Sequence, residues 1–198
     1  MTRVARRLVD LAISVPLLAL AAPLLVAAAV AIRLHDRGPI LFRQSRVGRH
    51  GEDFDMLKLR TMEVGAVGRG AGLAIAAGDS RITPVGRLLR RTSLDELPNL
   101  VNVARGEMSI VGPRPTLRHQ VETYTSGQRR RLEVKPGITG WAQIHGRASL
   151  PWSERIELDL WYVDHQSLAL DLRIIARTPA LLLRGVGLYK GSTGGWGR

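Results

Sequence analysis

The amino-acid sequence predicts an α+β fold. We expect a small, mostly helical domain with one β-hairpin, an N-terminal membrane helix and amphipathic helices near the C-terminus. Three observations support this prediction. Residues 11–32 form an apolar run without a charged side chain. Residues 40–47 and 54–60 have strand-like composition and flank a glycine-containing turn, which is typical of a hairpin. Most of the later chain consists of short helical patterns separated by proline and glycine.

Length and composition restrict the functional classes. At 198 residues the chain can form one domain with a core, together with an anchor. It has 29 lysines and arginines against 17 acidic residues, a net charge of +12. This excess predicts a polyanionic neighbour: nucleic acid, an anionic membrane or a phosphorylated substrate. The absence of cysteine excludes disulfides, zinc–thiolate sites and cysteine nucleophiles. The aromatic content of 5% gives little support for base stacking.

The N-terminal apolar run is long enough to span a bilayer, which takes about 20 residues. Pro16 and Pro23 interrupt it, and we expect the helix to break at Pro23. Basic residues flank both of its ends, and the positive-inside tendency places basic flanks on the cytoplasmic face. These features favour a re-entrant helix that returns to the side it entered from. A membrane-spanning anchor and a cleaved signal peptide remain as alternatives.

The predicted hairpin carries two cations on its second strand. Alternate residues of a strand share a face, so Lys58 and Arg60 are expected to point the same way. They could bind an anion together or form a solvated outer face. The following segment, residues 63–80, is rich in glycine but lacks the Walker pattern. We interpret it as a flexible loop that could cover a site.

Two adjacent carboxylates, Asp95 and Glu96, lie at the centre of the chain after a pair of arginines. Ser93 and Glu96 match the capping-box spacing, which places Asp95 at the start of a helix. Pro98 would also allow the helix to begin later, near Glu96. The entrance of a helix favours negative charge and can receive a phosphate. On the motif alone, a simple helix cap is the plainer explanation.

Further candidate contacts follow in the second half. A short helix is predicted over 81–91, another over 97–104 and a strand over 108–111. Arg114 stands between two prolines that restrict its backbone, which suits either a preorganised anion contact or an ordinary rigid turn. Gln143 and Arg147 lie on a turn-rich loop as plausible polar contacts with a substrate.

The C-terminal third is predicted to be helical. A helix opened by residues 149–151 has an apolar stripe that we assign to the core, and its acidic residues Glu154, Glu157 and Asp159 are expected to be partly solvated. From residue 168 the pattern is that of an interfacial amphipathic helix, broken at Thr178 and Pro179. We therefore divide the chain into an anchor (1–37), a catalytic domain (38–190) and a disordered tail (191–198).

Six short motifs in this order resemble those of the monotopic bacterial polyprenyl-phosphate phosphoglycosyl transferases. The resemblance covers nearly the whole chain and implies a re-entrant membrane helix broken at a Ser-Pro pair, where this sequence has Ala22 and Pro23. Any one motif is modest, but six in order are highly specific. They occupy residues 7–10, 38–44, 58–62, 89–98, 109–115 and 135–140.

The resemblance implies transfer of a phospho-sugar from a nucleoside-diphosphate sugar, with UDP expected, to polyprenol phosphate, with release of UMP. In this family the aspartate of the pair attacks the phosphorus nearest the sugar, a role that falls to Asp95. Glu96 is counted with it in the catalytic pair, where it could bind metal or merely cap the helix. Cations must offset the charge of the diphosphate. The candidates are Lys58, Arg60, Arg90 and Arg114. A Mg²⁺ ion is expected near the diphosphate, with Asp95 or Glu96 as its protein ligand.

The implied location is the bacterial inner membrane, with the catalytic domain facing the cytosol and anionic lipids as neighbours. Such a step would begin glycoconjugate or exopolysaccharide synthesis. The competing class is a membrane-tethered basic scaffold or nucleic-acid-binding protein. The sequence has no helix-turn-helix, zinc or RNA-recognition signature, so we expect no nucleic-acid partner. The sugar, the pathway and the choice between a monomer and a homodimer stay open.

Overall fold

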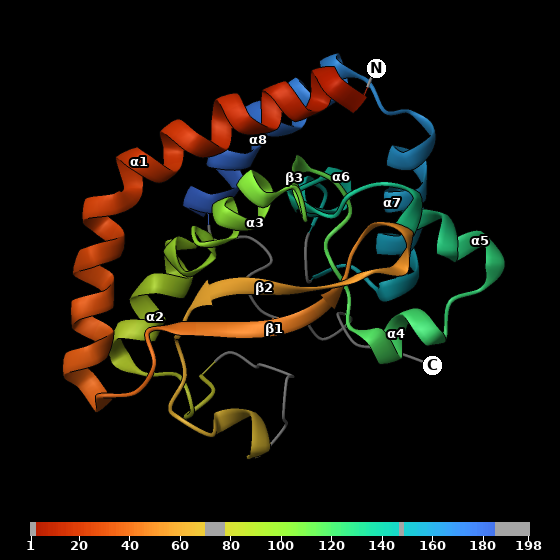
Figure 1. Cartoon of the computed structure of the whole chain (residues 1–198). Coiled ribbons are helices and arrows are strands. Elements are labelled where there is room, and N and C mark those ends of the chain that lie inside the picture. The colour runs from red at the N-terminus through yellow and green to blue at the C-terminus, as the bar shows by residue number, and fades with distance from the viewer. Residues whose placement is uncertain (1–2, 70–77, 147–148, 185–198) are drawn as a thin grey trace.

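A computed structural model describes residues 3–69, 78–146 and 149–184 of the chain. It has mixed helix and strand, with a long N-terminal helix lying along one side of a smaller body (Figure 1). This agrees with the predicted fold class. The helices and strands are α1 (Arg3–Asp36), β1 (Leu41–Val47), β2 (Asp53–Leu59), α2 (Pro84–Arg91), α3 (Asn99–Arg105), β3 (Ser109–Val111), α4 (Arg118–Glu122), α5 (Ser126–Arg129), β4 (Gly137–Thr139), α6 (Trp141–Ile144), α7 (Trp152–Asp164) and α8 (Leu168–Arg184). Short 3₁₀ turns cover Arg49–Gly51, Ala66–Gly68, Leu94–Glu96 and Arg130–Glu133.

Helix α1 contains both prolines of the apolar run. Pro16 and Pro23 lie inside one continuous helix, so Pro23 does not separate two helices as predicted. Proline removes one backbone hydrogen bond and crowds the preceding turn, which bends a helix without necessarily ending it. Figure 1 shows α1 curving over its length. Among the described residues, Val4–Asp36 is the one helix that is long and apolar enough to cross a membrane.

Both ends of α1 are fastened to the same folded body. Near its start, Arg7 donates two hydrogen bonds of 2.5 Å to carbonyl oxygens of α3, those of Val103 and Ala104. Asp10, which is buried, accepts hydrogen bonds of 2.8 Å from the hydroxyl of Ser109 and from a backbone N–H of β3. At the other end, Asp36 forms an ion pair with Arg60 beyond β2.

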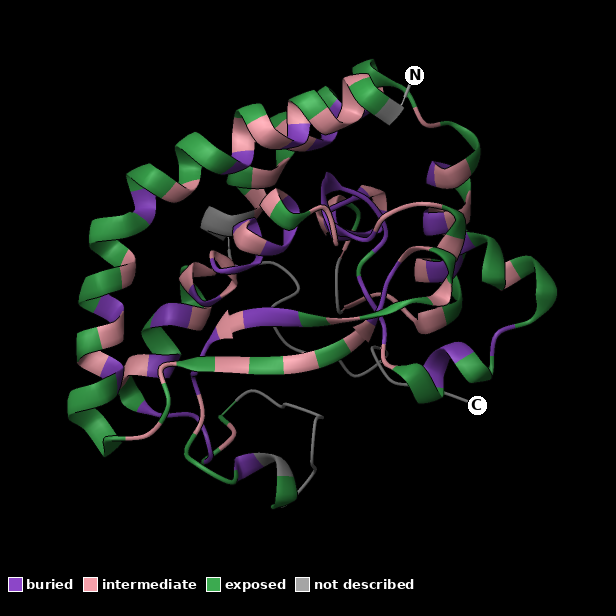
Figure 2. Cartoon of the chain, in the orientation of Figure 1, coloured by how far each residue is buried: buried purple, intermediate pink, exposed green. Residues whose placement is uncertain are grey.

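Between these two attachments α1 exposes apolar side chains. Figure 2 shows much of this helix coloured as exposed. Leu20 and Leu34 are each 79% exposed. Such a continuous apolar surface is unusual for a protein surrounded by water and is typical of a membrane or protein contact. The other large apolar side chains of α1 that are exposed are Val4, Leu8, Val15, Leu17, Leu24, Val26 and Val30.

The hairpin forms as predicted. Strands β1 and β2 are antiparallel and joined through the Arg49–Gly51 turn. The register pairs Phe42 with Lys58, Gln44 with Met56 and Arg46 with Phe54, so these six side chains share one face. Met56 on this face is 3% exposed. This face therefore packs against the main core, while Leu57 and Leu59 are buried on the opposite face.

The main core joins the hairpin to the helices. Met56 packs with Leu100 and Val103 of α3 and with Tyr162 of α7 and Ile174 of α8. Burial of such apolar side chains is the main favourable contribution to folding. Because these residues come from segments far apart in sequence, the core fixes the hairpin relative to α3 and thereby relative to the carboxylate pair that precedes α3.

A second, parallel strand pair lies beside this core. The sequence correctly predicts β3, but β4 falls in a segment that we expected to be only a turn-rich loop. The pairing brings two backbones into close contact. A Cβ atom on Gly137 would lie 2.1 Å from the backbone nitrogen of Gly112, and one on Gly140 would lie 2.2 Å from the Gly112 oxygen. Only glycine fits at these two positions.

The C-terminal helices differ from prediction at two points. Helix α8 continues through Pro179 instead of breaking there, and the hydroxyl of Thr178 donates a 2.8 Å hydrogen bond to the Ile174 carbonyl within the same helix. Asp159 on α7 is buried rather than partly solvated, since it pairs with a buried arginine. Helix α7 otherwise begins and packs as predicted.

Two predicted features fall wholly or partly outside the described residues. The proposed lid covers 63–80, of which 70–77 are not described, and the predicted tail 191–198 is not described. At the base of the loop, Arg81 binds Asp79 at 2.7 Å and the backbone carbonyl of Arg69 at 2.7 Å. The role of the loop as a lid stays a prediction.

Candidate active site

The carboxylate pair lies in the Leu94–Glu96 turn between α2 and α3. The capping box that the sequence predicts is wrong: Ser93 has a φ of 56° and caps no helix with its side chain. Helix α3 begins only at Asn99, after Pro98. The reason is long-range, because the Glu96 side chain turns away from the backbone of Ser93 and binds cations from other segments.

Glu96 is the acceptor that gathers the cations. Lys58 donates to Glu96 Oε1 at 2.7 Å, and Arg114 donates to Oε1 at 2.5 Å and to Oε2 at 3.3 Å. Burial opposes ionisation of Glu96, but the charges of Arg114 and Lys58 outweigh it and hold its pKa well below the ordinary value. Glu96 is therefore ionised and engaged at neutral pH.

Asp95 has a different environment. Its side chain is buried, and it makes no hydrogen bond or ion pair with any residue that the structure describes. Burial and the adjacent negative charge of Glu96 raise its pKa to about 6, while Lys58, Arg90 and Arg114 oppose the rise. Asp95 thus stays mostly ionised at pH 7 and keeps both oxygens free.

The cations near Asp95 come from three elements. Lys58 extends from β2, Arg90 from α2, and Arg114 from the turn after β3. Arg90 is oriented by Thr61, whose hydroxyl accepts a 2.7 Å hydrogen bond from the Arg90 Nε. The structure therefore brings together three of the four cations that the sequence singles out.

Arg60 is the fourth, and its contacts lie elsewhere. Its guanidinium pairs with Asp36 at the end of α1, and its Nε donates to the Pro39 carbonyl at 2.6 Å. Arg60 lies just past the end of β2, so the strand alternation that predicts a shared direction with Lys58 does not hold. The arginine attaches α1 to the hairpin.

The two predicted substrate contacts on the later loop have separate outcomes. Gln143 is 6% exposed and lies behind the turn, where its Nε2 donates to the Gly112 carbonyl at 3.5 Å. Its Oε1 has no partner within the part of the chain that the structure describes. This position supports the turn rather than presenting a surface contact. Arg147 lies outside the described residues.

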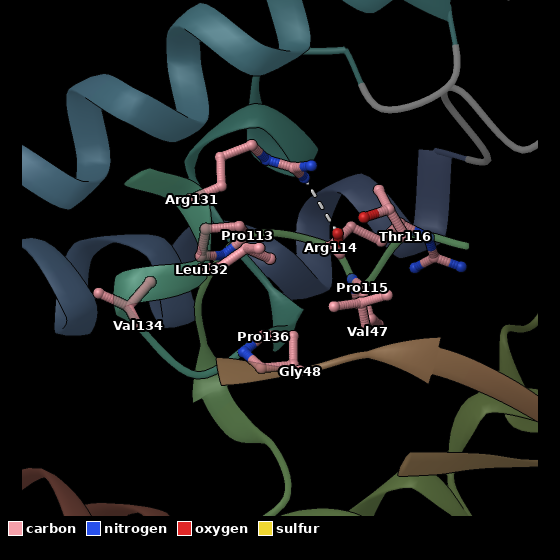
Figure 3. Close-up of a pocket in the computed structure, with 10 residues that line it drawn as sticks. All are labelled: Val47, Gly48, Pro113, Arg114, Pro115, Thr116, Arg131, Leu132, Val134 and Pro136. Carbon is pink, nitrogen blue, oxygen red and sulfur yellow. Dashed lines mark hydrogen bonds between the residues drawn. The ribbon is translucent and has the colours of Figure 1, made fainter. Parts of the chain in front are cut away.

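The backbone of the turn that carries Arg114 is held from several sides. Gly137 N–H donates to the Pro113 carbonyl at 2.9 Å, and Arg131 Nη2 donates to the Arg114 carbonyl at 3.0 Å. Figure 3 shows Arg131 reaching this carbonyl next to a pocket behind the turn. The space in it that the centre of a water molecule can reach is only about 10 Å³, which leaves room for about one water. We assign the pocket and Arg131 to the support of Arg114.

Sequence reasoning missed Arg46 and Arg131. Arg46 shares the inner face of the hairpin with Lys58, which the alternation of the two strands could have indicated. Arg131 belongs to a run of arginines, and nothing in the local sequence indicates that it is buried. Only its ion pair with the distant Asp159 shows that it is a buried structural residue.

The carboxylates offer limited metal ligation. No group of three or more His, Cys, Asp or Glu side chains within residues 3–69, 78–146 and 149–184 could hold a metal ion. Mg²⁺ commonly binds one or two carboxylates and completes its shell with water and phosphate oxygens. The free oxygens of Asp95 fit this kind of shared site, provided that a phosphorylated ligand supplies most of the other ligands.

The arrangement as a whole suits attack on a phosphate group. An ionised, unpaired carboxylate can act as a nucleophile. Fixed cations next to it can stabilise the charge that accumulates on phosphate oxygens. The carboxylate and the cations are supplied by the hairpin, α2, the turn before α3 and the turn after β3, so the folded domain is needed to assemble them.

Comparison with known proteins gives a consistent result. The family model described as bacterial sugar transferase matches residues 1–185. An uncharacterized sugar transferase, EpsL of Bacillus subtilis, is 42% identical over 93% of this chain and 90% of its own length. The UDP-glucose:undecaprenyl-phosphate glucose-1-phosphate transferase of Caulobacter vibrioides is 45% identical over 89% of this chain and 69% of its own length. The Escherichia coli protein of the same description is 41% identical, but the match covers only 39% of its length.

Proposed function

The chain belongs to the bacterial sugar transferase family and is a phosphoglycosyl transferase, and we propose that its reaction proceeds through a phosphoaspartyl-sugar on Asp95. The general reaction moves a sugar phosphate from a UDP-sugar to undecaprenyl phosphate, as the names of its relatives state for them. The observation that carries the proposal is the ionised, unpaired Asp95 beside fixed cations.

In the first step, an Asp95 carboxylate oxygen attacks the phosphorus that bears the sugar. The bond between this phosphorus and the bridging oxygen breaks, and UMP leaves with that oxygen. In the second step, a phosphate oxygen of the lipid attacks the same phosphorus, and the bond to Asp95 breaks. Asp95 is returned as a carboxylate, so neither step requires a net proton transfer.

The cations have distinct parts in this proposal. Lys58 and Arg114 bind Glu96 in the structure described here, and both can turn N–H groups toward phosphate oxygens because each has more donors than Glu96 uses. Arg90, held by its hydrogen bond to Thr61, adds a positive charge that favours the ionised form of Asp95. Mg²⁺, held by the diphosphate with one carboxylate of the pair, would supply further charge neutralisation. Arg60 is assigned to the support of α1.

We also propose that α1 enters and leaves the membrane on the cytosolic side of the bacterial inner membrane. Two observations support a re-entrant helix: α1 curves (Figure 1), and both of its ends are bound to one body, through Arg7 and Asp10 at the start and Asp36 at the end. A helix that crossed the bilayer would place these ends roughly 30 Å apart on opposite faces. The re-entrant placement also brings the site to the lipid surface, where the acceptor phosphate lies.

The direct test supplies the purified membrane-bound chain with a panel of UDP-sugars and Mg²⁺, with and without polyprenol phosphate. With both substrates we expect steady release of UMP for one or a few sugars. With the donor alone we expect at most one UMP per protein and a phospho-sugar mass increment on the peptide that contains Asp95. Release of UDP instead of UMP, or turnover with no adduct on Asp95 under any trapping condition, would contradict the mechanism.

A further inference from the structure

Arg46 lies next to the candidate site and has no part in the mechanism above. It is in β1, two residues after Gln44, and both side chains lie on the hairpin face that also carries Lys58. Within the part of the chain that the structure describes, no carboxylate forms an ion pair with Arg46. A partly buried guanidinium without a counter-ion is costly, so an anion that binds there would be favoured.

The guanidinium of Arg46 is held in a defined orientation. Gln44 Oε1 accepts hydrogen bonds from its Nε at 3.2 Å and its Nη2 at 2.6 Å, and the Pro115 carbonyl accepts one from Nη1 at 3.1 Å. These three bonds leave two of its roughly five N–H donors, one on each terminal nitrogen. A side chain fixed in this way loses little freedom when it binds a ligand.

The charge of Arg46 interacts with the charges of Glu96 and Arg114 in the carboxylate site. Burial lowers its pKa to about 10, with a further lowering by the positive charge of Arg114 and a partial compensation by Glu96. It therefore remains charged at neutral pH, close to both residues. With Arg46 included, the site has four cations against the two carboxylates Asp95 and Glu96. The surplus of positive charge matches a dianionic diphosphate.

We propose that Arg46 is a further phosphate-binding residue of the donor site, oriented by Gln44 and directed at the diphosphate of the nucleotide-sugar. The inference rests on the proposed function, because it assumes a nucleoside-diphosphate donor. It extends that function by assigning the inner face of the hairpin, through Arg46 and Lys58, to the diphosphate. The Arg46 N–H groups not used by Gln44 and Pro115 bind its oxygens.

The chain offers a matched control. Arg43 lies three residues away in β1, on the opposite face of the hairpin. Its side chain is exposed and has no hydrogen bond or ion pair with the residues described. We compare Arg46→Gln and Arg46→Lys with Arg43→Gln in the full chain, purified in nanodiscs, and measure binding of UDP and of uridine by calorimetry. Thermal unfolding of each variant establishes that it is folded.

For Arg46→Gln we expect UDP affinity to fall by about tenfold or more, the usual size of a lost charge-assisted hydrogen bond, with uridine affinity unchanged. Arg46→Lys keeps the charge but lacks the planar fork, so its loss should be intermediate. Arg43→Gln should bind UDP within about twofold of the wild type, since its charge is exposed and screened. Unchanged UDP affinity in Arg46→Gln would overturn the inference, as would an equal loss of UDP and uridine binding.

A double-mutant cycle separates direct binding from support of the Pro115 turn. If Arg46 acts only by holding Arg114 in place, Arg46→Gln will cause no further loss of UDP affinity in an Arg114→Ala background. A further loss of about tenfold supports direct contact, and its absence refutes it. The outcome is distinguishable from failure of the proposed function: a wild-type chain that neither binds UDP nor releases UMP refutes that function, whereas normal wild-type behaviour with an inert Arg46 refutes only this inference.

Discussion

Arg131 and Asp159 form a buried ion pair, with 2.6 Å between Nη2 and Oδ2 and only 3% of each side chain exposed. The same guanidinium stacks near the rings of Tyr124 and Trp152 and donates to the carbonyl of Arg114. A buried charge is tolerated when a partner compensates it. The pair therefore connects α7 to the backbone of Arg114, a predicted phosphate-binding residue, through the side chain of Arg131.

Asp159→Asn should destabilise the protein by about 3–5 kcal/mol, because it leaves the charge of Arg131 buried without a counter-ion. Glu157→Gln, an exposed position on the same helix, is the matched control and should change the free energy of unfolding by less than about 0.5 kcal/mol. Denaturant unfolding of both variants in the same detergent makes the comparison. Equal stabilities would mean that the pair contributes little to the folded state.

Asp95→Asn should abolish both UMP release and the covalent adduct, because the amide cannot act as the nucleophile. Membrane association should be unchanged, since α1 is untouched. UMP release is measured with donor alone and with both substrates, and membrane association by sedimentation with vesicles. Near-normal turnover by this variant would exclude Asp95 as the nucleophile.

The raised pKa of Asp95 predicts a specific pH dependence of stability. Because the folded-state value of about 6 exceeds the ordinary 3.8, the folded chain binds this proton more tightly than the unfolded chain. The resulting stabilisation is present below about pH 4 and is lost as the pH rises through about 6. Asn at position 95 cannot ionise. The stability of Asp95→Asn relative to the wild type should therefore increase by on the order of 2–3 kcal/mol between pH 4 and pH 7.

This difference is measured by unfolding both proteins at a series of pH values, since contributions from other groups cancel in the subtraction. The donor half-reaction requires ionised Asp95, so the UMP burst should decline as the pH falls below about 6. A stability difference that is independent of pH would show that the environment of Asp95 does not penalise its charge.

Arg114→Lys should reduce the rate by at least about tenfold although it preserves the charge. Lysine cannot reproduce the two hydrogen bonds that Arg114 makes with Glu96, nor the planar fork that suits a phosphate. Steady-state kinetics for the donor measure the effect, with Arg118→Lys at an exposed position of helix α4 as a control. An unchanged rate for Arg114→Lys would mean that Arg114 has only a structural role in a rigid turn.

Local sequence patterns predicted the hairpin, helices α2, α3 and α7, and the identity of the carboxylate pair. They failed where distant partners decide the conformation. Ser93 matches a capping box, but Lys58 and Arg114 compete for Glu96 and leave Ser93 in a left-handed turn. Strand β4 is too short to be recognised until β3 pairs with it.

The same reason explains the errors in the candidate site. Arg60 and Lys58 look equivalent in sequence, and only the position of Asp36 at the end of α1 distinguishes them. Strand alternation could have placed Arg46 on the face of Lys58, but only the structure shows that Gln44 and the Pro115 carbonyl hold its guanidinium. Residue type and spacing therefore singled out candidate residues, whereas the partners of each charge required the tertiary structure.

The attachment of both ends of α1 to one body leads to a topological prediction. The sequence has no cysteine, so single cysteines can be placed at Thr2→Cys and His35→Cys, one before and one at the end of the helix. A membrane-impermeant maleimide should label both in inside-out vesicles and neither in right-side-out vesicles, because a re-entrant helix keeps both ends on the cytosolic face. A cysteine at Glu154→Cys on α7, exposed on the folded domain, reports on which side of the membrane the domain lies in the same preparations.

If Thr2→Cys and His35→Cys react from opposite sides, α1 spans the membrane. The hydrogen bonds of Arg7 and the ion pair of Asp36 could then not both exist in the membrane-bound protein, since both are made to a domain that lies on one side.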